Sequence, residues 1–476
     1  MKTTSSQHLS RRSFIRTAGL GVAGIGALTL ARDKASAAPV DAASFSEPAR
    51  AIPLAGTAEV IVCGAGPAGV TAAITAARAG AKVRLFEAHG ALGGVWTSSL
   101  LGYLLDFDKP GFNQELIRKL DERDARRIPS ASAMAYEPEE MKVLLDELCG
   151  AAGVMVQFHT RVVAAYRDGR RLSAIVTESK SGRQAWRAPV FIDATGDGDL
   201  GAQAGCEWEI GESKGCPCQP LSMNVLLVVK DHTQLNQFIH RAMGGDKGTI
   251  GDPKRALLAE IKRAGVTPSY AMPTLFPIRD NLLLAMMNHQ YGVLAYDAAA
   301  VSEATIQARA ELHKIVRALR KLGGPWDGIQ IAATPEQIGI RDGRRIRGRY
   351  VMTREDLING ARFDDAVVRP TFPVDIHAYD RSHAGGGYTS NGVKVKPYDV
   401  PLRALIAKDV DGLMMAGRCI SGDYIAHASY RVTGNAVAMG EAAGAVAAVA
   451  AQAKRPPHDV PWSEGQVAIE KARRLA

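Results

Sequence analysis

Three glycines and one acidic residue have the spacing of a site for nucleotide phosphates. Gly64, Gly66 and Gly69 form the pattern G-x-G-x-x-G. In this pattern the first glycine makes a tight turn, the second lets a pyrophosphate approach the backbone, and the third lets a helix pack closely on a strand. Glu87 follows after about 20 residues, the separation at which an acid binds ribose hydroxyls. We therefore predict a dinucleotide site that includes Gly64, Gly66, Pro67, Ala68, Gly69 and Glu87.

The elements that must position these residues are a strand, a helix and a second strand. An apolar run over 60–63 ends directly at the glycine motif, and a stretch rich in small residues follows over 70–78. A second apolar run, over 82–86, ends at the acid. This order is that of a βαβ unit, in which the helix N-terminus offers unpaired N–H groups and the positive end of its dipole to the phosphates.

Two later segments contain glycine turns of the same general kind. Glu87 is followed by Ala88 and a short loop that ends in Gly93-Gly94. An apolar run over 190–193 ends in Ala194-Thr195-Gly196-Asp197. An apolar run that stops at a glycine is typical of a buried parallel strand, so each turn alone would indicate little. The order of these turns along the chain, after the first glycine motif, is what indicates a dinucleotide-binding fold.

The C-terminal part adds a third segment. A strand-like run over 411–415 leads to Gly417-Arg418, and a stretch rich in glycine and alanine follows over 431–444. Together, the segments resemble the extended fingerprint of FAD-dependent oxidoreductases of the glutathione-reductase type. The resemblance implies FAD as the cofactor and an α/β fold: a Rossmann-like FAD-binding domain, with a parallel sheet and helices on both faces, and an inserted α+β substrate or cap domain. It further implies FAD contacts at Ala88, Gly93, Gly94, Val163, Ala194, Thr195, Gly196, Asp197, Gly417, Arg418, Gly434, Asn435 and Ala436.

The first residues predict a twin-arginine signal peptide. Arg11-Arg12 precedes an uncharged stretch over 17–30, and Ala35-Ser36-Ala37 supplies small residues for cleavage. We expect a signal over 1–37, a mature protein that begins near Ala38, the twin-arginine export machinery as a partner, and a periplasmic or exported location. No later segment reaches about 18 apolar residues, so the sequence predicts a soluble protein without a permanent membrane span.

Charge and cysteine content narrow the classes of function. The chain has a net charge of +9, and removing residues 1–37, with six basic residues and one acid, lowers it to +4. Nucleic-acid binding then loses its main support. Cys206 could pair with Cys216 or Cys218, whereas a C-x-C spacing argues against a catalytic dithiol. No histidine or cysteine accompanies them at metal spacing, so no metal is expected.

The motifs also predict a division of the chain. We expect a linker over 38–57, a first part of the FAD-binding domain over 58–215 with a helical insertion over 114–150, and a substrate or cap domain over 216–365. The FAD-binding domain returns over 366–455, and a tail follows over 456–476.

Four segments of the second half, 338–350, 363–366, 374–377 and 426–432, resemble a broad group of bacterial FAD-dependent oxidoreductases, many of them exported. The chain departs from that group at Asp342-Gly343, where the group tends to have an acid-Ser pair. The resemblance implies flavin redox chemistry without naming a substrate.

Candidate catalytic residues follow from the chemistry of hydride transfer to a flavin. Oxidation of C–OH to C=O needs a base, and histidine suits neutral pH. His427 is the first candidate because this family folds that segment beside the flavin ring, and His377, near Asp375, is the second. Each could instead be a packed structural histidine. Arg431 is a candidate for flavin or substrate contact, and Arg341 or Arg345 for binding an anionic substrate.

We therefore expect an exported FAD-dependent dehydrogenase or oxidase that transfers a hydride from a small polar substrate, a sugar, an alcohol or an organic acid, to flavin N5. Electrons would pass to a quinone, a cytochrome or dioxygen. One alternative is a C=C reductase of the fumarate-reductase-like type, with Arg341 or Arg381 as proton donor. Another is a flavin electron-transfer subunit without its own small substrate.

Overall fold

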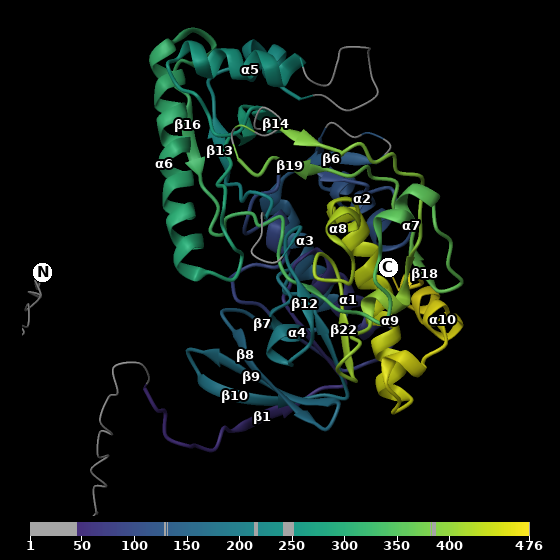
Figure 1. Cartoon of the computed structure of the whole chain (residues 1–476). Coiled ribbons are helices and arrows are strands. Elements are labelled where there is room, and N and C mark those ends of the chain that lie inside the picture. The colour runs from purple at the N-terminus through teal and green to yellow at the C-terminus, as the bar shows by residue number, and fades with distance from the viewer. Residues whose placement is uncertain are drawn as a thin grey trace, which may run out of the picture. The chain divides into compact units, whose positions relative to one another are not determined.

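The computed structural model describes residues 45–127, 130, 132–213, 218–240, 252–380, 382 and 387–475. The predicted signal peptide, over 1–37, lies outside the described residues, and so do Arg381 and Cys216. The chain divides into two units, Met1–Ala51 and Ile52–Ala476. Every element below belongs to the second unit (Figure 1).

A parallel sheet of five strands forms the centre of this unit, in the order β22-β11-β2-β3-β7. Every neighbouring pair in it is parallel. The strands are β2 (Val60–Cys63), β3 (Val83–Phe86), β7 (Met155–Gln157), β11 (Val190–Asp193) and β22 (Leu413–Met415). Strands β2, β11 and β22 are wholly buried, which explains their continuous apolar sequences. The predicted Rossmann-like α/β fold is confirmed.

Two helices pack backbone to backbone beside this sheet. They are α1 (Pro67–Arg78) and α9 (Thr433–Gln452), and their small residues allow the approach. A Cβ atom at Gly440 would lie 2.2 Å from the carbonyl oxygen of Ala68, and one at Gly444 would lie 2.2 Å from that of Ala72. The glycines of α9 are therefore needed for packing, independently of any ligand.

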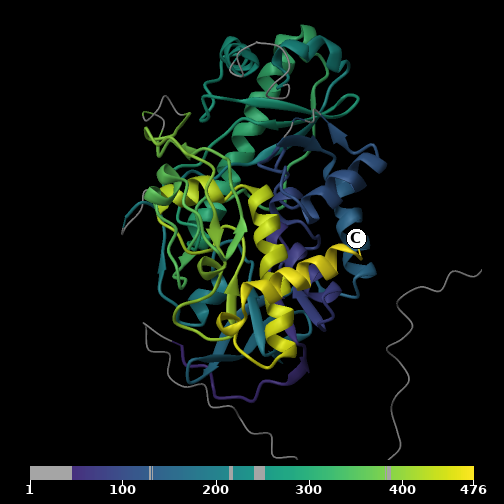
Figure 2. The same ribbon diagram turned by 90° about the vertical axis from the view of Figure 1, so that its right-hand side faces the viewer.

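Helix α9 is also long and apolar enough to cross a membrane by length and composition, which the sequence-based expectation had not recognised. However, 89% of the window is buried inside the protein. Helix α10 (Trp462–Arg473), in the segment predicted as a tail, packs against α9 (Figure 2). Helix α9 is thus a core helix of this fold.

A second sheet has the order β1-β10-β9-β8. Strands β8 (Arg161–Asp168), β9 (Arg171–Ser179) and β10 (Gly182–Arg187) form an antiparallel meander. Strand β1 (Leu54–Thr57) pairs with β10 in parallel. Residues 54–57 are therefore a strand and not part of the predicted linker, because pairing with a distant segment, and not a local apolar pattern, makes them extended.

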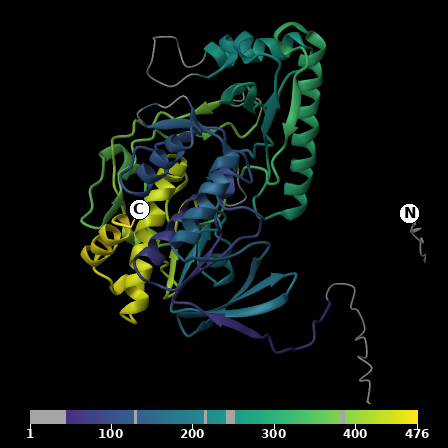
Figure 3. The same cartoon turned by 180° about the vertical axis from the view of Figure 1, so that it is seen from behind.

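The cap has an antiparallel sheet of its own, in the order β14-β15-β13-β16. Its strands are β13 (Asn224–Val228), β14 (Thr274–Arg279), β15 (Leu282–Met286) and β16 (Gln330–Ala333). Helices α5 (Asp252–Arg263) and α6 (Ala298–Leu322) accompany it (Figure 3). The side chains between these elements form a separate hydrophobic core. All of these elements lie within the range predicted for the inserted domain.

The segment over 114–150 is not wholly helical as predicted. Helices α2 (Phe112–Glu122) and α3 (Pro138–Ala151) flank strands β5 (Arg126–Arg127) and β6 (Ala133–Tyr136). Strand β6 is buried, pairs with β4 (Leu104–Leu105) and contacts β14 of the cap. Pairing with residues far from it in sequence makes this apolar run a strand.

Short elements complete the unit. They are α4 (Asp199–Gln203), α7 (Arg354–Asn359), α8 (Tyr424–Tyr430), β12 (Trp208–Glu209), β17 (Arg345–Ile346), β18 (Ala366–Val368), β19 (Ile376–His377), β20 (Tyr388–Thr389), β21 (Val400–Pro401) and the 3₁₀ turns η1 (Gly94–Trp96), η2 (His232–Phe238), η3 (Gly324–Trp326), η5 (Leu402–Leu405) and η6 (Pro457–Asp459).

The cysteines differ in part from the expectation. Cys206 is a free, buried thiol in the main core, so the suggested pairing of Cys206 is wrong. Cys218 is disulfide-bonded. Cys63 and Cys419 are also free and buried, as expected for small residues that pack beside the central strands.

Candidate functional site

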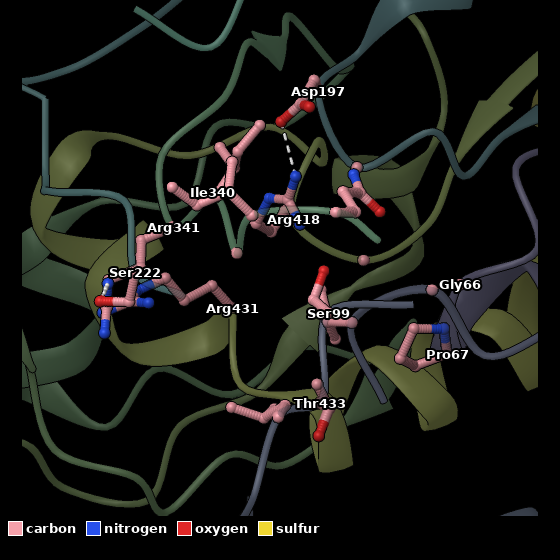
Figure 4. A pocket seen from close by; sticks show the side chains of 18 of the residues that line it. Gly66, Pro67, Ser99, Asp197, Ser222, Ile340, Arg341, Arg418, Arg431 and Thr433 are labelled. Atoms are coloured by element: carbon pink, nitrogen blue, oxygen red, sulfur yellow. Dashed lines mark hydrogen bonds and ion pairs between the residues drawn. The ribbon is translucent and has the colours of Figure 1, made fainter. Parts of the chain in front are cut away.

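One cavity of about 850 Å³ runs from the glycine motif to the cap (Figure 4). Most of the predicted site residues line it: Gly64, Gly66, Pro67, Ala68, Glu87, Ala88, Gly94, Ala194, Thr195, Gly196, Asp197, Arg341, His377, Gly417, Arg418, Arg431 and Ala436. Six do not: Gly69, Gly93, Val163, His427, Gly434 and Asn435. Its volume is within the range of ligand and cofactor sites.

The three glycines of the motif have three different geometries. Gly64 has φ +93°, and a Cβ there would lie 2.5 Å from the carbonyl oxygen of Ala194. A Cβ at Gly69 would lie 1.9 Å from the carbonyl oxygen of Gly64, so this position serves helix packing. A Cβ at Gly66 would meet nothing within 4 Å. Gly66 therefore faces open space in the cavity, where a ligand can approach the backbone.

The N-terminus of α1 points its free N–H groups at this space. Gly66 is the N-cap, Pro67 is in the first turn, and no side chain caps the helix. Unpaired N–H groups and the helix dipole together favour an anion at such a position. These features fit a pyrophosphate.

Glu87 and the paired glycines complete the nucleotide end. The carboxylate of Glu87 accepts hydrogen bonds from the N–H groups of Ala65, at 2.7 Å, and His89, at 2.9 Å. The backbone at Gly94 passes so close to Gly66 that a Cβ would lie 2.9 Å from the Gly66 Cα. The N–H of Gly93 donates to the carbonyl of Ala65. Glu87 thus holds the glycine turn in shape and also borders the cavity.

The turn after β11 is fixed by Asp193. This buried carboxylate accepts hydrogen bonds from Thr195 and from the N–H of Gly201. Burial raises the pKa of Asp193 to about 6, against the lowering effect of these bonds. Asp197 projects into the cavity, where Arg418 contacts it at 2.5 Å. The pair joins the turn after β11 to the turn after β22.

Several buried polar atoms around the cavity have no partner among the described residues. Ser99 Oγ, Thr433 Oγ1 and the side-chain nitrogen and oxygen of Asn435 are in this state. They cluster near the N-terminus of α9, which has no side-chain cap at Val432. Buried polar groups are almost always hydrogen-bonded, so the hydroxyls of Ser99 and Thr433, which line the cavity, fit the polar edge of a bound flavin.

The other end of the cavity contains a histidine–carboxylate pair. Nε2 of His377 lies 3.3 Å from Oδ2 of Asp375. Burial, with the positive charge of Arg341, lowers the pKa of His377 to about 4, although Asp375 acts in the opposite direction. Nδ1 of His377 is buried and has no partner among the described residues. The ring is therefore neutral at neutral pH, with one nitrogen free to accept a proton.

Arg431 fixes the position of this carboxylate. Its Nη2 donates to the side-chain oxygen of Gln219 at 3.0 Å and to the carbonyl oxygen of Asp375 at 2.8 Å, and it lies 3.4 Å from Oδ2 of Asp375. The same Gln219 oxygen accepts a hydrogen bond from the backbone N–H of His377. Burial would raise the pKa of Asp375, but His377 and the arginines around it outweigh this effect and lower that pKa strongly.

Arg341 lies at the boundary between the cap and the central domain. Its Nη1 donates to the carbonyl oxygen of Pro220 and to Ser222 Oγ, both at 2.8 Å. Burial, with the nearby charge of Arg431, lowers the pKa of Arg341 to about 10. Arg345, the other predicted anion-binding residue, does not line the cavity. It contacts Asp342 and donates to the backbone carbonyls of Gly211 and Gly422. Arg345 therefore stabilises the fold and does not bind the substrate.

His427 is placed away from the cavity. Its side chain is fully buried on α8 and packs edge-on against Tyr430 at 5.6 Å between ring centroids. Burial and three neighbouring arginines lower the pKa of His427 well below its ordinary value. The geometry corresponds to the packed structural histidine that the sequence left open.

Several residues that line the cap end have no recognisable signal in the sequence. They are His240, Lys254, Tyr270, Phe276, Ser222 and Tyr388. Lys254 lies on α5, Phe276 on β14 and Tyr388 on β20, and the other three lie outside the helices and strands, so the six come from widely separated positions in the chain. No local spacing identifies them, although Lys254 lies on a helix of strongly amphipathic pattern. Within the described part of the chain, no three His, Cys, Asp or Glu side chains are grouped as metal ligands.

Several solved structures resemble the chain at low identity. A geranylgeranyl bacteriochlorophyll reductase-like protein from Thermoplasma acidophilum is 14% identical over 88% of this chain and 83% of its own, with a TM-score of 0.42. The flavin-dependent brominase Bmp2 is 13% identical over 87% and 83%, with a TM-score of 0.43. The p-nitrophenol 4-monooxygenase PnpA from Pseudomonas putida is 11% identical over 62% and 70%, with a TM-score of 0.38. Likenesses this distant say nothing about the substrate.

No curated protein matches the chain significantly. A family model does, and it extends over the glycine motif, the cap and the C-terminal helices. Its description is FAD dependent oxidoreductase, and it matches residues 59–470. The cavity geometry independently fits FAD at the glycine motif and α9. The chain therefore belongs to the FAD-dependent oxidoreductase family and is a flavoenzyme.

Proposed function

We propose that this enzyme is a dehydrogenase or oxidase that removes a hydride from a small polar substrate bearing a C–OH group, with His377 as the base. The pairing of His377 with Asp375 in the cavity, with Nδ1 free, carries this proposal. A quinone, a cytochrome or dioxygen would take the electrons. We propose His377 as the base in place of His427, which the sequence favoured, because His427 does not border the cavity.

FAD, when bound, supplies the hydride acceptor N5. It would be held by the cavity residues of the glycine turns and by the N-terminus of α9: Gly64, Gly66, Pro67, Ala68, Glu87, Ala88, Gly94, Ala194, Thr195, Gly196, Asp197, Gly417, Arg418, Thr433 and Ala436. Gly69, Gly93, Val163, Gly434 and Asn435 remain proposed as supporting positions next to these residues.

The protein's own residues handle the proton. Asp375 orients the His377 ring by accepting from Nε2, and Arg431 and Gln219 hold that pair in place. Nδ1 can then take the proton of the substrate hydroxyl as the C–H bond breaks and its hydride leaves the carbon. Such a base contributes about 10²- to 10⁴-fold in rate.

Anaerobic bleaching of the flavin band tests the proposal. The purified protein is mixed with sugars, alcohols and organic acids, and the rate of bleaching is followed for the wild type and for His377→Gln and Asp375→Asn. We expect one class of donor to bleach the flavin, and His377→Gln to slow bleaching by about 10²-fold or more. His313→Gln on α6, away from the cavity, is the matched control. Equal bleaching rates in His377→Gln and the wild type would contradict the role of His377.

One observation favours a second candidate function, the reduction of a C=C bond. Burial next to Arg431 lowers the pKa of Arg341 to about 10, which is the change that an arginine proton donor needs. This version predicts that no donor bleaches the flavin, whereas a chemically reduced protein is reoxidised by unsaturated acids. Arg341→Met would abolish that reoxidation. A protein that responds to neither donors nor acceptors would support the electron-transfer alternative.

We also propose export by the twin-arginine route, with a periplasmic location. The support is the Arg11-Arg12 motif, the uncharged stretch after it and the small residues at 35–37. N-terminal sequencing of the protein from the periplasmic fraction should begin near Ala38, and Arg11→Lys with Arg12→Lys should retain the precursor in the cytoplasm. A mature protein in the cytoplasm with Met1 intact would rule the proposal out.

A further inference from the structure

We infer that the substrate carries a carboxylate, and that Arg341 and Lys254 bind it at the cap end of the cavity. The inference rests on the proposed function for the reacting C–OH group, so the full substrate would be a hydroxy acid. The recognition of the carboxylate stands on the charges and contacts of the cavity itself.

The charged side chains that line the cavity are not balanced evenly along its length. Arg418 pairs with Asp197 at 2.5 Å, and Arg344 pairs with Asp199 at 2.8 Å. These pairs balance the region next to the nucleotide end. Farther along the cavity, Asp375 lies 3.4 Å from Arg431, and Arg341 and Lys254 are the other cations near it. Glu336, an acid of the cap that also lines the cavity, instead contacts His89 at 3.2 Å, next to the nucleotide end. Three cations thus lie near the one carboxylate of Asp375, and His377, which is neutral at neutral pH, adds no charge of either sign.

Arg341 has no ion pair in the part of the chain that the structure describes. Its Nη1 is satisfied by a carbonyl and a hydroxyl, both uncharged acceptors, and its Nη2 lies 3.7 Å from the sulfur of Met286. Sulfur is a weak acceptor, so this side of the guanidinium lacks a strong partner. A guanidinium held by neutral groups and buried in a cavity is suited to a carboxylate, which can bind it with two hydrogen bonds.

Lys254 supplies the second positive charge. It lies on α5 and lines the same cavity. Its Nζ is 5.9 Å from the centroid of the Tyr388 ring, and among the described residues no carboxylate lies within ion-pair distance of it. Burial lowers its pKa, and Asp375 opposes this effect. A lysine ammonium that is half-buried without a counter-charge costs free energy, which a bound anion would offset.

Both cations act on the same small region. Each is an electrostatic neighbour of Asp375, the partner of the proposed base. Figure 4 shows Arg341 and Arg431 side by side, with Ser222 next to Arg341. A carboxylate bound there would place the rest of the substrate beside His377. Tyr103 and Phe276, stacked at 5.3 Å between centroids, form an apolar wall of this cavity for the remaining carbon atoms.

The reaction balances with this substrate. The C–H hydride, with its two electrons, passes to FAD, and the hydroxyl proton passes to Nδ1 of His377. The C–OH group becomes C=O, and the carboxylate is unchanged throughout. The acid group therefore contributes binding and orientation without taking part in the oxidation.

Matched acids and amides test the inference on the FAD-loaded protein. Binding of benzoate and benzamide is measured from the change in the flavin spectrum, a readout independent of turnover. Anaerobic bleaching is then measured with lactate and mandelate against lactamide and mandelamide. We expect each acid to bind at least about 10-fold more tightly than its amide, because a hydrogen bond to a charged group is stronger than one to a neutral group.

Four variants locate the effect. Arg341→Met and Lys254→Met should each weaken acid binding by about 10- to 100-fold and leave amide binding unchanged. Arg347→Met, which loses an outer ion pair with Glu209, and Lys262→Met, on the exposed side of α5, are the controls and should keep the acid preference. Because the ratio of acid to amide is taken within each variant, partial misfolding does not imitate the result.

The outcomes separate the two proposals. Amides that bind as tightly as acids, or an acid preference that survives both Arg341→Met and Lys254→Met, would overturn the carboxylate inference. Bleaching by neutral alcohols or sugars alone would leave the dehydrogenase proposal intact and still overturn the inference. Acids that bind in an Arg341-dependent manner but never bleach the flavin would support the carboxylate site and contradict the dehydrogenase proposal.

Discussion

At the scale of single residues, burial decides what the titratable groups of this enzyme can do. His377 and His427 are both removed from water, and burial lowers the pKa of each. The difference lies in their surroundings. His377 has a carboxylate at 3.3 Å and borders the cavity, whereas His427 has only arginines as charged neighbours and packs on Tyr430. Only the first environment can stabilise a histidine that takes up a proton during a reaction.

The pKa of His377 predicts an unusual pH profile. The base must be neutral to accept a proton, and its pKa of about 4 keeps it neutral over the whole range above that value. We expect kcat/KM for the donor to stay constant as the pH falls from 7 to 5, and to fall only as the pH passes through about 4. With an ordinary histidine as base, the enzyme would lose activity as the pH falls through about 6.5, because the histidine would become protonated there. Circular dichroism at each pH shows whether the fold persists, and an acid limb between pH 6 and 7 would contradict the assignment.

At the scale of elements, the contact between α1 and α9 positions both ends of the flavin site. The helices approach so closely that the backbone of α1 fills the space where Gly440 and Gly444 would carry side chains. Their N-termini, at Gly66 and Val432, thereby both open into the one cavity. One helix can then serve a pyrophosphate and the other the flavin ring.

A substitution at the first of these N-termini separates folding from cofactor binding. A Cβ at Gly66 would meet no protein atom within 4 Å, and the residue has φ −67°, so valine fits the protein itself. Gly66→Val should fold, but its affinity for FAD should be at least about 100-fold lower, because the valine side chain occupies the space of the pyrophosphate. The FAD content of the purified protein and titration with FAD measure this. Gly150→Val on α3, also in open space, is the control and should bind FAD normally. Normal FAD affinity in Gly66→Val would mean that the nucleotide site is elsewhere.

At the scale of the whole molecule, buried histidines make stability depend on pH. Burial lowers the pKa of His240 to about 4, and it also lowers the pKa of His289 and of His427 well below the ordinary histidine value. The unfolded chain binds protons at these positions from about pH 6.5 downward, and the folded protein does not. The free energy of unfolding therefore loses their contribution as the pH falls below about 6.5. Asp193, whose pKa is raised to about 6, acts in the opposite direction.

One variant isolates a single member of this set. His427→Gln removes a group whose protonation in the folded protein is opposed by burial and by neighbouring arginines. The difference in free energy of unfolding between wild type and variant should shift in favour of the variant by about 1.4 kcal/mol for each pH unit below 6.5. Denaturant unfolding of both proteins at pH 7.5, 6 and 5, with excess FAD, measures the shift. A difference that does not change with pH would show that His427 is protonated in the fold.

The nucleotide half of the site was predictable from sequence because its signals are local. The strand, the glycine turn, the helix and Glu87 are consecutive in the chain. Gly64 and Gly69 are required by nearby backbone, and Gly66 leaves the space that a pyrophosphate needs. The strands at 190–193 and 411–415 carry the same kind of signal, a buried apolar run that ends in a glycine turn. FAD as cofactor followed from these short segments and their order.

The cap half of the site was decided only by the tertiary structure. Lys254 on α5, Gln219 before β13 and His377 in β19 come together through packing between elements far apart in the chain. His427, inside α8, packs against Tyr430, whereas Arg431, at the C-terminal end of the same helix, lines the cavity. No local sequence pattern predicts this difference. Likewise, residues 54–57 and 133–136 are strands because distant segments pair with them. Local sequence specifies turns and buried strands through backbone geometry, whereas burial and long-range contacts determine which side chains meet in the cavity and what charge they carry.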